Sequence, residues 1–372
     1  MRKKNKKSRI IIITSEFLPG PGGIGNHAFC LSRGLSEKRF EICVIAPKEL
    51  NFNAKKFDDN TNFRILRYFN KKLFKFFHIY FFLLKELDIK DKTIVISTGI
   101  VPLIILGLLF KKSNIKRLAI IHGHETGIGN IIIRTIINYS LKQYDKLICV
   151  SKFSKERIGN NNIKKKSIVI NNGVDIERFS RFLDSNKKRE KKLKLVTLGS
   201  LSYRKGQHNV IKALPYLKKY YNDICYHMIG PENIKKELIV LAKSLKILDS
   251  ITFHGFLEDQ KIAELFYDSD IFIMLSEVLE NGDVEGFGIA ILEANFFGLP
   301  SIGSKDCGIQ DAIRNHKTGI LVDNHSPKEI KKALDEILIN YEKFSKYSIK
   351  WSKEHNWKII TEKYIKILND IF

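Results

Sequence analysis

Short apolar runs alternate with longer amphipathic segments along this 372-residue chain, and this alternation constrains the fold more than any other feature. In the first half of the chain the apolar runs fall at residues 10–14, 42–46, 94–97, 117–121, 146–150 and 167–170. Strands that are buried on both faces read as continuous apolar runs of this kind. Because segments with helical spacing separate the runs, we predict an α/β domain with a doubly wound parallel sheet.

A charged stretch with few large apolar residues interrupts the alternation at residues 181–192, as expected of an exposed linker. Beyond it the apolar runs resume at residues 193–200, 224–230, 251–256, 270–276, 299–304 and 319–323. We therefore expect two sheets of the same kind, in an N-terminal domain at residues 1–180 and a C-terminal domain at residues 193–350. The amphipathic segment at residues 351–372 predicts a helix that packs back toward the N-terminal domain. Two such domains would face each other across a cleft at the carboxyl ends of their strands, where open α/β sheets bind ligands.

The chain carries a large positive charge, because 64 Lys and Arg residues outnumber 40 Asp and Glu residues to give a formal net charge of +24. This excess favours an acidic partner, which would be nucleic acid, an anionic membrane or a phosphorylated substrate. A Lys-rich genome composition would explain the same excess without any partner. The five cysteines are scattered and lack paired-ligand spacing, which favours a reducing compartment and argues against a zinc site.

Two segments raise the question of a membrane. Residues 94–110 run for seventeen positions without a charge, but Pro102 and several polar residues interrupt a run already shorter than the ~20 residues of a spanning helix. We expect a buried strand there, followed by a core helix that starts at Pro102. Residues 67–87 interleave lysines with phenylalanines, which predicts either a helix lying on anionic lipid or a core helix with solvated lysines. The N-terminal apolar run is too short for the core of a signal peptide.

Two loops carry groups suited to a phosphate. The sequence PGPGGIGNH follows the first predicted strand and places Gly22 and Gly23 before a helix, where backbone N–H groups can approach an anion. Its spacing matches neither a P-loop nor a dinucleotide-binding fingerprint. The sequence GSLSYRKG follows the first strand of the second domain and places Arg204 and Lys205 before another helix. These cations would neutralise a diphosphate, or they form a solvated pair on a loop.

The sequence EGFGIAILE places Glu285 and Glu293 on either side of a helix start that we expect near residues 286–288. On one straight helix the two carboxylates would lie about 12 Å apart along the axis. A retaining pair of catalytic carboxylates needs about 5 Å, so these two do not act together on one bond. Their separation suits one long ligand that is contacted at two places.

These residues resemble a known family. The sequence EGFGIAILEA is similar to the E-x7-E element of the family 4 retaining glycosyltransferases, which have the two-domain GT-B fold. Five further resemblances to that family occur in the family's order, and together they cover nearly the whole chain. They are PGGIGNH, IHGHE, VINNGVDIERF, GSLSYRKG and the run that comprises ANFFGLPSIGS, CGIQDAI and TGILV.

The resemblance implies roles for individual residues. Glu293 would bond the nucleotide ribose, Glu285 a hydroxyl of the donor sugar, and His122 would lie against that sugar near the reacting carbon. Lys205, together with backbone N–H groups, would hold the diphosphate. The implied nucleotide-sugar site comprises Gly22, Gly23, Ser200, Arg204, Lys205, Glu285, Gly286, Phe287, Gly288, Ile289 and Glu293, and the candidates for the acceptor side are His27, His124, Glu125 and Asn172. No cofactor and no metal are expected, because the chain has no metal-binding Asp-x-Asp and the donor is a substrate.

The chain departs from the family pattern at two places. Ser200 stands where the family usually has an arginine after the phosphate-loop glycine, and we hypothesise that Arg204 supplies the missing cation from the other end of the loop. In the segment CGIQDAI, Cys307, Gln310 and Asp311 replace the more common Gly, Pro and Glu, so helix capping or donor contacts there differ from those of the family.

The resulting prediction is a retaining, metal-independent hexosyltransferase. It would move a sugar from a UDP- or GDP-sugar to a glycan or lipid-linked acceptor in bacterial surface polysaccharide synthesis, such as that of lipopolysaccharide, capsule or exopolysaccharide. It would act in the cytoplasm, with peripheral contact to anionic lipid of the inner membrane and without nucleic acid. Two alternatives stay open: a nucleotide-sugar epimerase of similar two-domain fold, and a basic, non-enzymatic nucleic-acid-binding protein.

Overall fold

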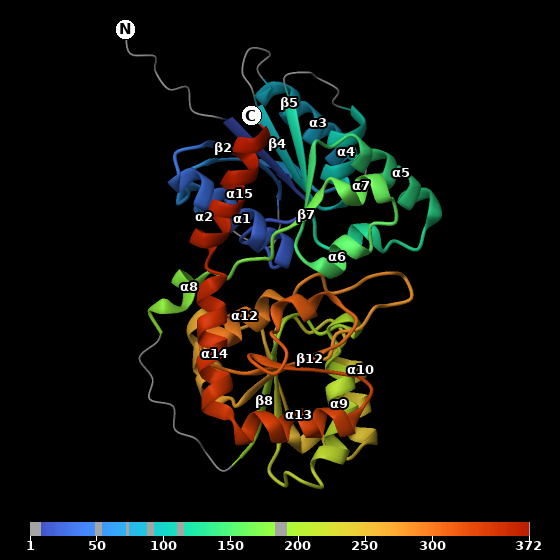
Figure 1. Ribbon diagram of the computed structural model, residues 1–372, viewed down its shortest axis with the longest axis vertical. Coiled ribbons are helices and arrows are strands. Elements are labelled where there is room, and N and C mark those ends of the chain that lie inside the picture. Colours follow the sequence, from blue (N-terminus) through green and yellow to red (C-terminus); the bar gives the residue numbers. More distant parts are fainter. Residues whose placement is uncertain are drawn as a thin grey trace. The chain divides into compact units, whose positions relative to one another are not determined.

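The computed structural model describes residues 9–48, 54–71, 74–87, 93–109, 115–182 and 192–371. Its contacts divide the chain into two compact units, of which the first comprises Met1–Asn172 and Trp357–Phe372 and the second comprises Gly173–Asn356 (Figure 1). The sequence analysis drew its domain boundary later, after residue 180, whereas the contacts assign α8 (Ile176–Ser180) to the second unit. Residues 183–191 of the expected linker lie outside the described residues.

The first unit is built on a parallel sheet that has seven strands among the described residues, in the order β3-β2-β1-β4-β5-β6-β7. The strands are β1 (Arg9–Thr14), β2 (Glu41–Lys48), β3 (Arg64–Phe69), β4 (Thr93–Thr98), β5 (Ile115–Ile121), β6 (Lys146–Cys149) and β7 (Ser167–Val169). Six of them confirm the predicted runs. The edge strand β3 was not predicted, because Arg64 and Arg67 interrupt its apolar pattern. Arg67 pairs with Asp58 at 2.6 Å, which satisfies its charge at the sheet edge.

The helices of the first unit cover both faces of this sheet. They are α1 (Gly23–Glu37), α2 (Ala54–Asp59), α3 (Phe74–Glu86), α4 (Ile100–Leu109), α5 (Ile131–Lys142), α6 (Lys152–Glu156), α7 (Asn161–Lys165) and α15 (Trp357–Ile371), with a 3-10 turn, η1 (His124–Thr126). Helices α3, α4 and α5 lie on one face of the sheet and α1 lies on the other, where it contacts α15. Right-handed crossovers on the two sides of β1 lead to this arrangement.

The uncharged segment at residues 94–110 folds as predicted into strand β4 and helix α4, although α4 begins at Ile100, two residues before Pro102. Leu103, Ile105 and Leu106 of α4 join the core beneath α3 and α5. Within the described ranges, no helix combines the length and the apolarity needed to cross a membrane.

The second unit has a parallel sheet of six described strands, in the order β10-β9-β8-β11-β12-β13, and all six confirm the predicted runs. The strands are β8 (Lys194–Leu198), β9 (Cys225–Ile229), β10 (Ile251–Gly255), β11 (Ile271–Met274), β12 (Ser301–Ser304) and β13 (Gly319–Val322). Besides α8, its helices are α9 (Gln207–Leu217), α10 (Lys235–Ser244), α11 (Asp259–Asp268), α12 (Ile289–Phe296), α13 (Pro327–Ile339) and α14 (Tyr341–Glu354).

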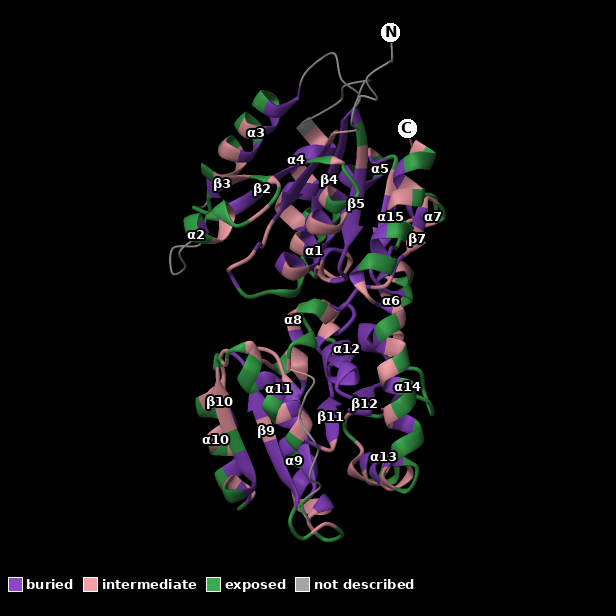
Figure 2. Ribbon diagram, turned by 90° about the vertical axis from the view of Figure 1, so that its left-hand side faces the viewer, coloured by how far each residue is buried: buried purple, intermediate pink, exposed green. Residues whose placement is uncertain are grey.

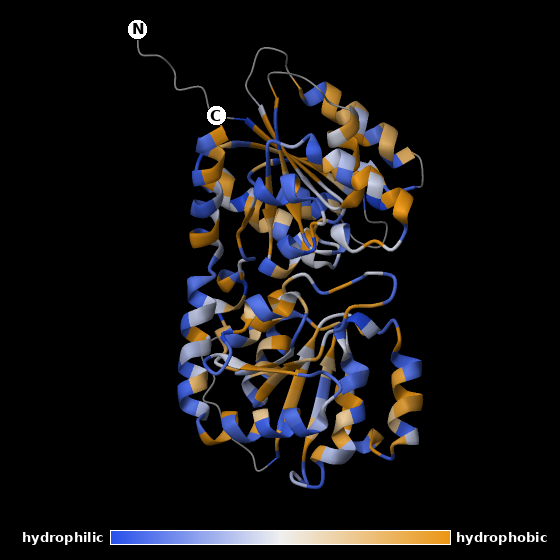
Figure 3. Cartoon of the chain, turned by 45° about the vertical axis from the view of Figure 1, so that its right-hand side comes forward, coloured by the Kyte–Doolittle hydropathy of each residue, from blue (hydrophilic) through white to orange (hydrophobic). Residues whose placement is uncertain are grey.

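Both units are Rossmann-like, with buried strands between layers of helices (Figures 2 and 3). In each sheet the strand order reverses next to the first strand, between β1 and β4 in the first unit and between β8 and β11 in the second. Ligands of open α/β sheets bind outside the carboxyl ends of the strands at such a reversal point. The loops after these four strands are therefore where a site is expected in each unit.

Candidate functional site

In the second unit, the loop after β8 packs against the end of β11. The loop contains a 3-10 turn, η2 (Tyr203–Lys205), that ends at Gly206 in the left-handed region with φ +73°. A Cβ on Gly206 would lie only 1.7 Å from the carbonyl oxygen of Leu275, so only glycine permits this approach. The backbone N–H of Glu277 donates to the carbonyl of Arg204 at 3.1 Å. The two loops at the reversal point are thus joined through their backbones.

The side chains of Arg204 and Lys205 converge on Glu285. Lys205 Nζ lies 2.7 Å from Glu285 Oε2, and the Arg204 guanidinium bonds the same oxygen. Arg204 Nε also lies 3.3 Å from Asp283 Oδ2. Burial would raise the pKa of Glu285, but the charges of Lys205 and Arg204 outweigh it and lower that pKa to about 2. The two cations are therefore not a solvated pair but part of a mostly buried cluster, which we call the cation clamp (Arg204, Lys205 and Glu285).

Helix α12 begins at Ile289 with Gly288 as its N-cap residue, which confirms the predicted helix start. Glu285 precedes the helix, so the separation of about 12 Å expected for two positions on one straight helix does not apply to this pair. The Glu285 carbonyl accepts a hydrogen bond from Gly308 N at 3.0 Å. A Cβ on Gly308 would lie 2.3 Å from the Glu285 and Gly286 carbonyl oxygens. The segment that departs from the family pattern at Cys307 therefore still supports the Glu285 loop, through Gly308.

Glu293 lies on α12, is buried, and pairs with an arginine that the sequence analysis did not identify. Its Oε1 accepts from Arg178 Nη1 at 3.0 Å, while Arg178 Nε donates to Asp259 Oδ1 at 2.8 Å. Burial raises the pKa of Glu293, and the charge of Arg178 opposes that effect. Arg178 is part of the NGVDIERF segment, which was quoted only for the family resemblance. Its partners could not be found from the sequence, because Glu293 follows it by 115 residues.

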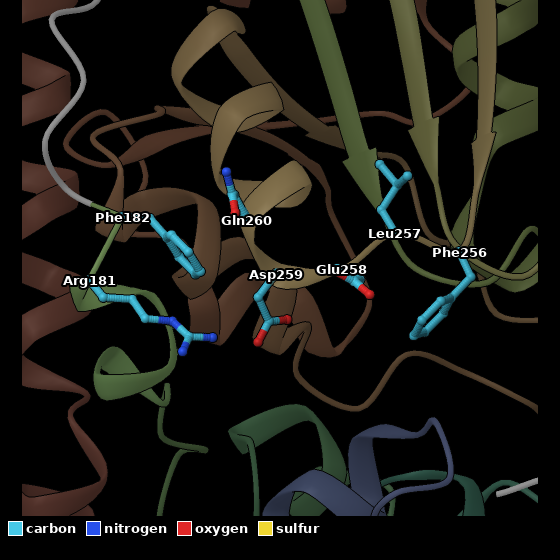
Figure 4. A pocket seen from close by; sticks show the side chains of 7 residues that line it. All are labelled: Arg181, Phe182, Phe256, Leu257, Glu258, Asp259 and Gln260. Carbon is cyan, nitrogen blue, oxygen red and sulfur yellow. The ribbon is translucent and has the colours of Figure 1, made fainter.

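An open pocket of about 530 Å³ adjoins this pair (Figure 4). Asp259, which holds Arg178, also lines the pocket, so the pocket lies beside the Arg178–Glu293 pair. The other lining residues are Arg181, Phe182, Phe256, Leu257, Glu258 and Gln260. The pocket forms where β10 ends and α11 begins, and no motif in the sequence pointed to it.

The remaining predicted residues of the second unit lie on the same loops. Ser200 is half-buried at the start of the loop after β8, and its carbonyl accepts from Gln207 Nε2 at 3.2 Å. Gly286 and Phe287 lie just before α12, where Phe287 is fully buried, and Ile289 is the first residue of that helix. The structure thus gathers the nine candidates of this unit at one reversal point, namely Ser200, Arg204, Lys205, Glu285, Gly286, Phe287, Gly288, Ile289 and Glu293.

In the first unit, Gly22 and Gly23 form an exposed turn at the start of α1. A Cβ on Gly23 would meet nothing within 4 Å, so the backbone there is open to a ligand. The Glu16 carboxylate lies close to Gly22, where an added Cβ would be 2.1 Å from Glu16 Oε2. A nearby carboxylate opposes phosphate binding, so this turn is a poorer anion site than the loop after β8.

His122 follows β5 and is held from two sides. Its Nε2 lies 2.8 Å from Thr98 Oγ1, and its backbone N–H donates to Glu125 Oε2 at 2.9 Å. Burial, aided by the neighbouring His27, lowers the pKa of His122 to about 3, so its ring is neutral near pH 7. Glu125 is fully buried, and its Oε2 also accepts from Gly123 N at 2.9 Å. Glu125 therefore shapes the His122 loop, and the half-buried His124 lies 3.6 Å from the same oxygen.

His27 and Asn172 are buried in the first unit. His27 Nε2 lies 3.0 Å from the Tyr364 hydroxyl, and its ring contacts that of Trp357 edge-on, so His27 packs between α1 and α15. Asn172 Oδ1 has no hydrogen-bond partner among the residues that the structure describes. A buried amide oxygen of this kind is available to a ligand.

Two family models together cover most of the chain: Glycosyltransferase Family 4 matches residues 21–178, and Glycosyl transferases group 1 matches residues 179–354. A GDP-mannose-dependent alpha-(1-6)-phosphatidylinositol monomannoside mannosyltransferase of Mycobacterium tuberculosis is 26% identical over 347 residues, which is 90% of each chain. The amylovoran biosynthesis glycosyltransferase AmsK of Erwinia amylovora is 24% identical over 227 residues, covering 60% of this chain and 54% of AmsK. The structure of Anabaena HepE in complex with UDP and glucose aligns with a TM-score of 0.76 at 16% identity, covering 98% of this chain and all of HepE.

Proposed function

Because this chain belongs to the family 4 glycosyltransferases and has their GT-B fold, we propose that it transfers a hexosyl group from a UDP- or GDP-sugar to a glycan or lipid-linked acceptor. The proposed setting is the synthesis of a bacterial surface polysaccharide, such as lipopolysaccharide, capsule or exopolysaccharide. AmsK, named for amylovoran biosynthesis, supports that setting. The family favours a transferase over the epimerase and the nucleic-acid-binding protein that the sequence left open.

The cation clamp is the observation that carries the proposal. Arg204 and Lys205 present two positive charges at the reversal point, which is where a nucleoside diphosphate is expected. Negative charge develops on the leaving diphosphate during sugar transfer, and fixed cations stabilise it most when they need not reorganise. Glu285 holds both cations in place, and it would contact a hydroxyl of the donor sugar. Two side-chain cations can supply the charge compensation that a divalent metal gives other enzymes, so we propose a metal-independent reaction.

The remaining donor contacts follow from the Arg178–Glu293 pair and its pocket. We assign the nucleotide ribose to Glu293, whose carboxylate Arg178 fixes, and the base to the neighbouring pocket. HepE was solved with UDP, and the mycobacterial relative is named as GDP-mannose-dependent, so both bases are candidates.

The acceptor would approach the first unit near His122. A neutral imidazole beside the donor sugar can accept or donate a hydrogen bond without carrying charge. We propose that the sugar leaves and is attacked on the same face, with the departing phosphate helping to deprotonate the acceptor, so that configuration is retained. The proposed place of action is the cytoplasmic side of the inner membrane.

The test is a thermal shift of the purified protein, with EDTA present, against UDP, GDP, ADP and their sugar conjugates. A ligand at 100 times its dissociation constant stabilises the folded protein by about 2.7 kcal/mol. We expect a shift with one base that the variant Glu293→Ala loses and that the control Glu342→Gln, on exposed α14 surface, keeps. The absence of a shift with every nucleotide would refute the assignment of the donor site.

A further inference from the structure

Helix α3 buries one side and exposes large aromatic residues on the other. Ile79 and Leu83 are fully buried against the sheet, as a core helix requires. Phe74, Phe77 and Phe81, by contrast, are 66%, 70% and 61% exposed, and Tyr80 and Leu84 are also exposed. The core interpretation of residues 67–87 therefore accounts for only one side of the helix. Three exposed phenylalanines on one short helix are more than a solvated surface explains.

A second exposed apolar group begins α5. Ile131 and Ile132 are 66% and 68% exposed, and Ile133, Ile136 and Tyr139 are also exposed. Asn130 caps this helix, because its side-chain oxygen accepts from the backbone N–H groups of Ile132 and Ile133 at 3.0 and 3.2 Å. The cap fixes the first turn as a helix, with its isoleucines facing solvent.

Helix α4 lies between these two groups and contacts both α3 and α5. Its sequence, IVPLIILGLL, has no charged or polar side chain, and Val101 and Ile104 are half-buried. All three helices cover the same face of the sheet, and Figure 3 shows hydrophobic residues on their outer turns. The exposed sides of α3, α4 and α5 thus form one apolar surface, which we call the α3–α5 face.

The charges on these helices are of one sign. Lys75, Lys85, Arg134 and Lys142 are exposed or half-buried. The single acidic residue of the three helices as described is Glu86, which is buried and pairs with Arg9 at 2.6 Å and with Arg64 at 3.1 Å. An apolar surface edged by cations is complementary to an anionic bilayer, which offers a hydrocarbon interior beneath negative headgroups.

We propose that the α3–α5 face binds the surface of an anionic membrane. The phenylalanines and isoleucines enter the interfacial region, and the basic residues remain among the headgroups. Helix α5 also contacts η1, which carries His124 of the His122 loop. Membrane binding would therefore bring lipid-anchored molecules next to the loop that, under the proposed function, receives the acceptor.

The experiment is co-sedimentation of the full-length protein with vesicles of phosphatidylglycerol and phosphatidylcholine, compared with phosphatidylcholine alone. We expect binding to the anionic vesicles to fall by about tenfold or more in the double variants Phe77→Gln/Phe81→Gln and Ile131→Gln/Ile132→Gln. The matched control is Val240→Gln/Ile339→Gln, which removes two exposed apolar residues from the second unit and should bind as the unmodified protein does.

Three outcomes would overturn the proposal. The first is failure of the unmodified protein to sediment with anionic vesicles. The second is equal binding by the control and both test variants, because that result would assign binding to the overall charge. The third is a lower oligomeric mass of the lipid-free test variants, with vesicle binding unchanged, since the face would then join two copies of the chain. The nucleotide thermal shift should persist in every variant, which separates this proposal from that of the donor site.

Discussion

The cation clamp makes a quantitative prediction about stability and pH. The pKa of Glu285 is lowered from 4.5 to about 2 in the folded protein. A difference of this size corresponds to about 3 kcal/mol of favourable interaction of the ionised carboxylate, at 1.36 kcal/mol per unit. Because the folded pKa is the lower one, this contribution is complete well above pH 4.5 and is lost as the pH falls toward 2. At pH 3 only about 1.4 kcal/mol should remain.

The perturbation that isolates this contribution is Glu285→Gln, which keeps the side-chain shape and removes the titration. The chain has two tryptophans, and Trp351 belongs to the second unit. Urea unfolding would be followed by Trp351 fluorescence in a Trp357→Phe background, between pH 3 and pH 7. The free energy of unfolding should be higher with Glu285 than in the Glu285→Gln variant, and this difference should shrink by about 2 kcal/mol from pH 7 to pH 3.

The pH-independent part of the difference contains lost contacts and says nothing about charge. A difference that stays constant from pH 7 to pH 3, or that grows on acidification, would refute the clamp. The control Glu342→Gln should show no such pH dependence, because Glu342 is exposed on α14.

Three further predictions concern the remaining residues. Arg204→Ala should lower the transfer rate by at least about tenfold, whereas Lys192→Ala, an exposed lysine just before β8, should not, and equal rates in a donor-turnover assay would contradict the hypothesis that Arg204 replaces the family arginine. His122 should contribute no ionisation between pH 5 and 8 to kcat/KM, because its pKa is about 3, and a step near pH 6.5 that disappears in His122→Asn would show the ring to be charged. Tyr364→Phe leaves buried His27 without its hydroxyl partner and should cost about 1 to 3 kcal/mol in unfolding free energy, and a neutral effect in urea denaturation would mean that this bond does not stabilise α15.

The sequence predicts the strands well, because a strand buried on both faces must be apolar along its length. All six strands of the second sheet and six of the first follow this rule. Strand β3 breaks it, since an edge strand can carry Arg64 and Arg67 with their charges satisfied by Glu86 and Asp58. Residues 67–87 therefore look like one segment in the sequence, although they contain the end of a strand and a separate helix.

The candidate site is predicted in its motifs but not in its partners. Glu285, Arg204 and Lys205 stand out in the sequence, yet their mutual pairing depends on two loops that meet at a reversal of strand order. Arg178 looks like an ordinary charged residue until tertiary contacts place it against Glu293. Long-range pairs of this kind have no local signal, so single-sequence reasoning could not find them.

The route of the chain through the two units has a consequence for its synthesis. The second unit, Gly173–Asn356, is an insertion within the first, because α15 returns to pack on α1. The bond between His27 and Tyr364 joins residues 337 positions apart. A ribosome therefore delivers the whole second unit before it delivers the helix that covers α1. A nascent chain stopped before Trp357 would hold a finished second unit beside a first unit whose α1 face is bare, and such exposed apolar surface is what chaperones and proteases recognise. Incomplete translation products of this protein would in this way mark themselves for removal.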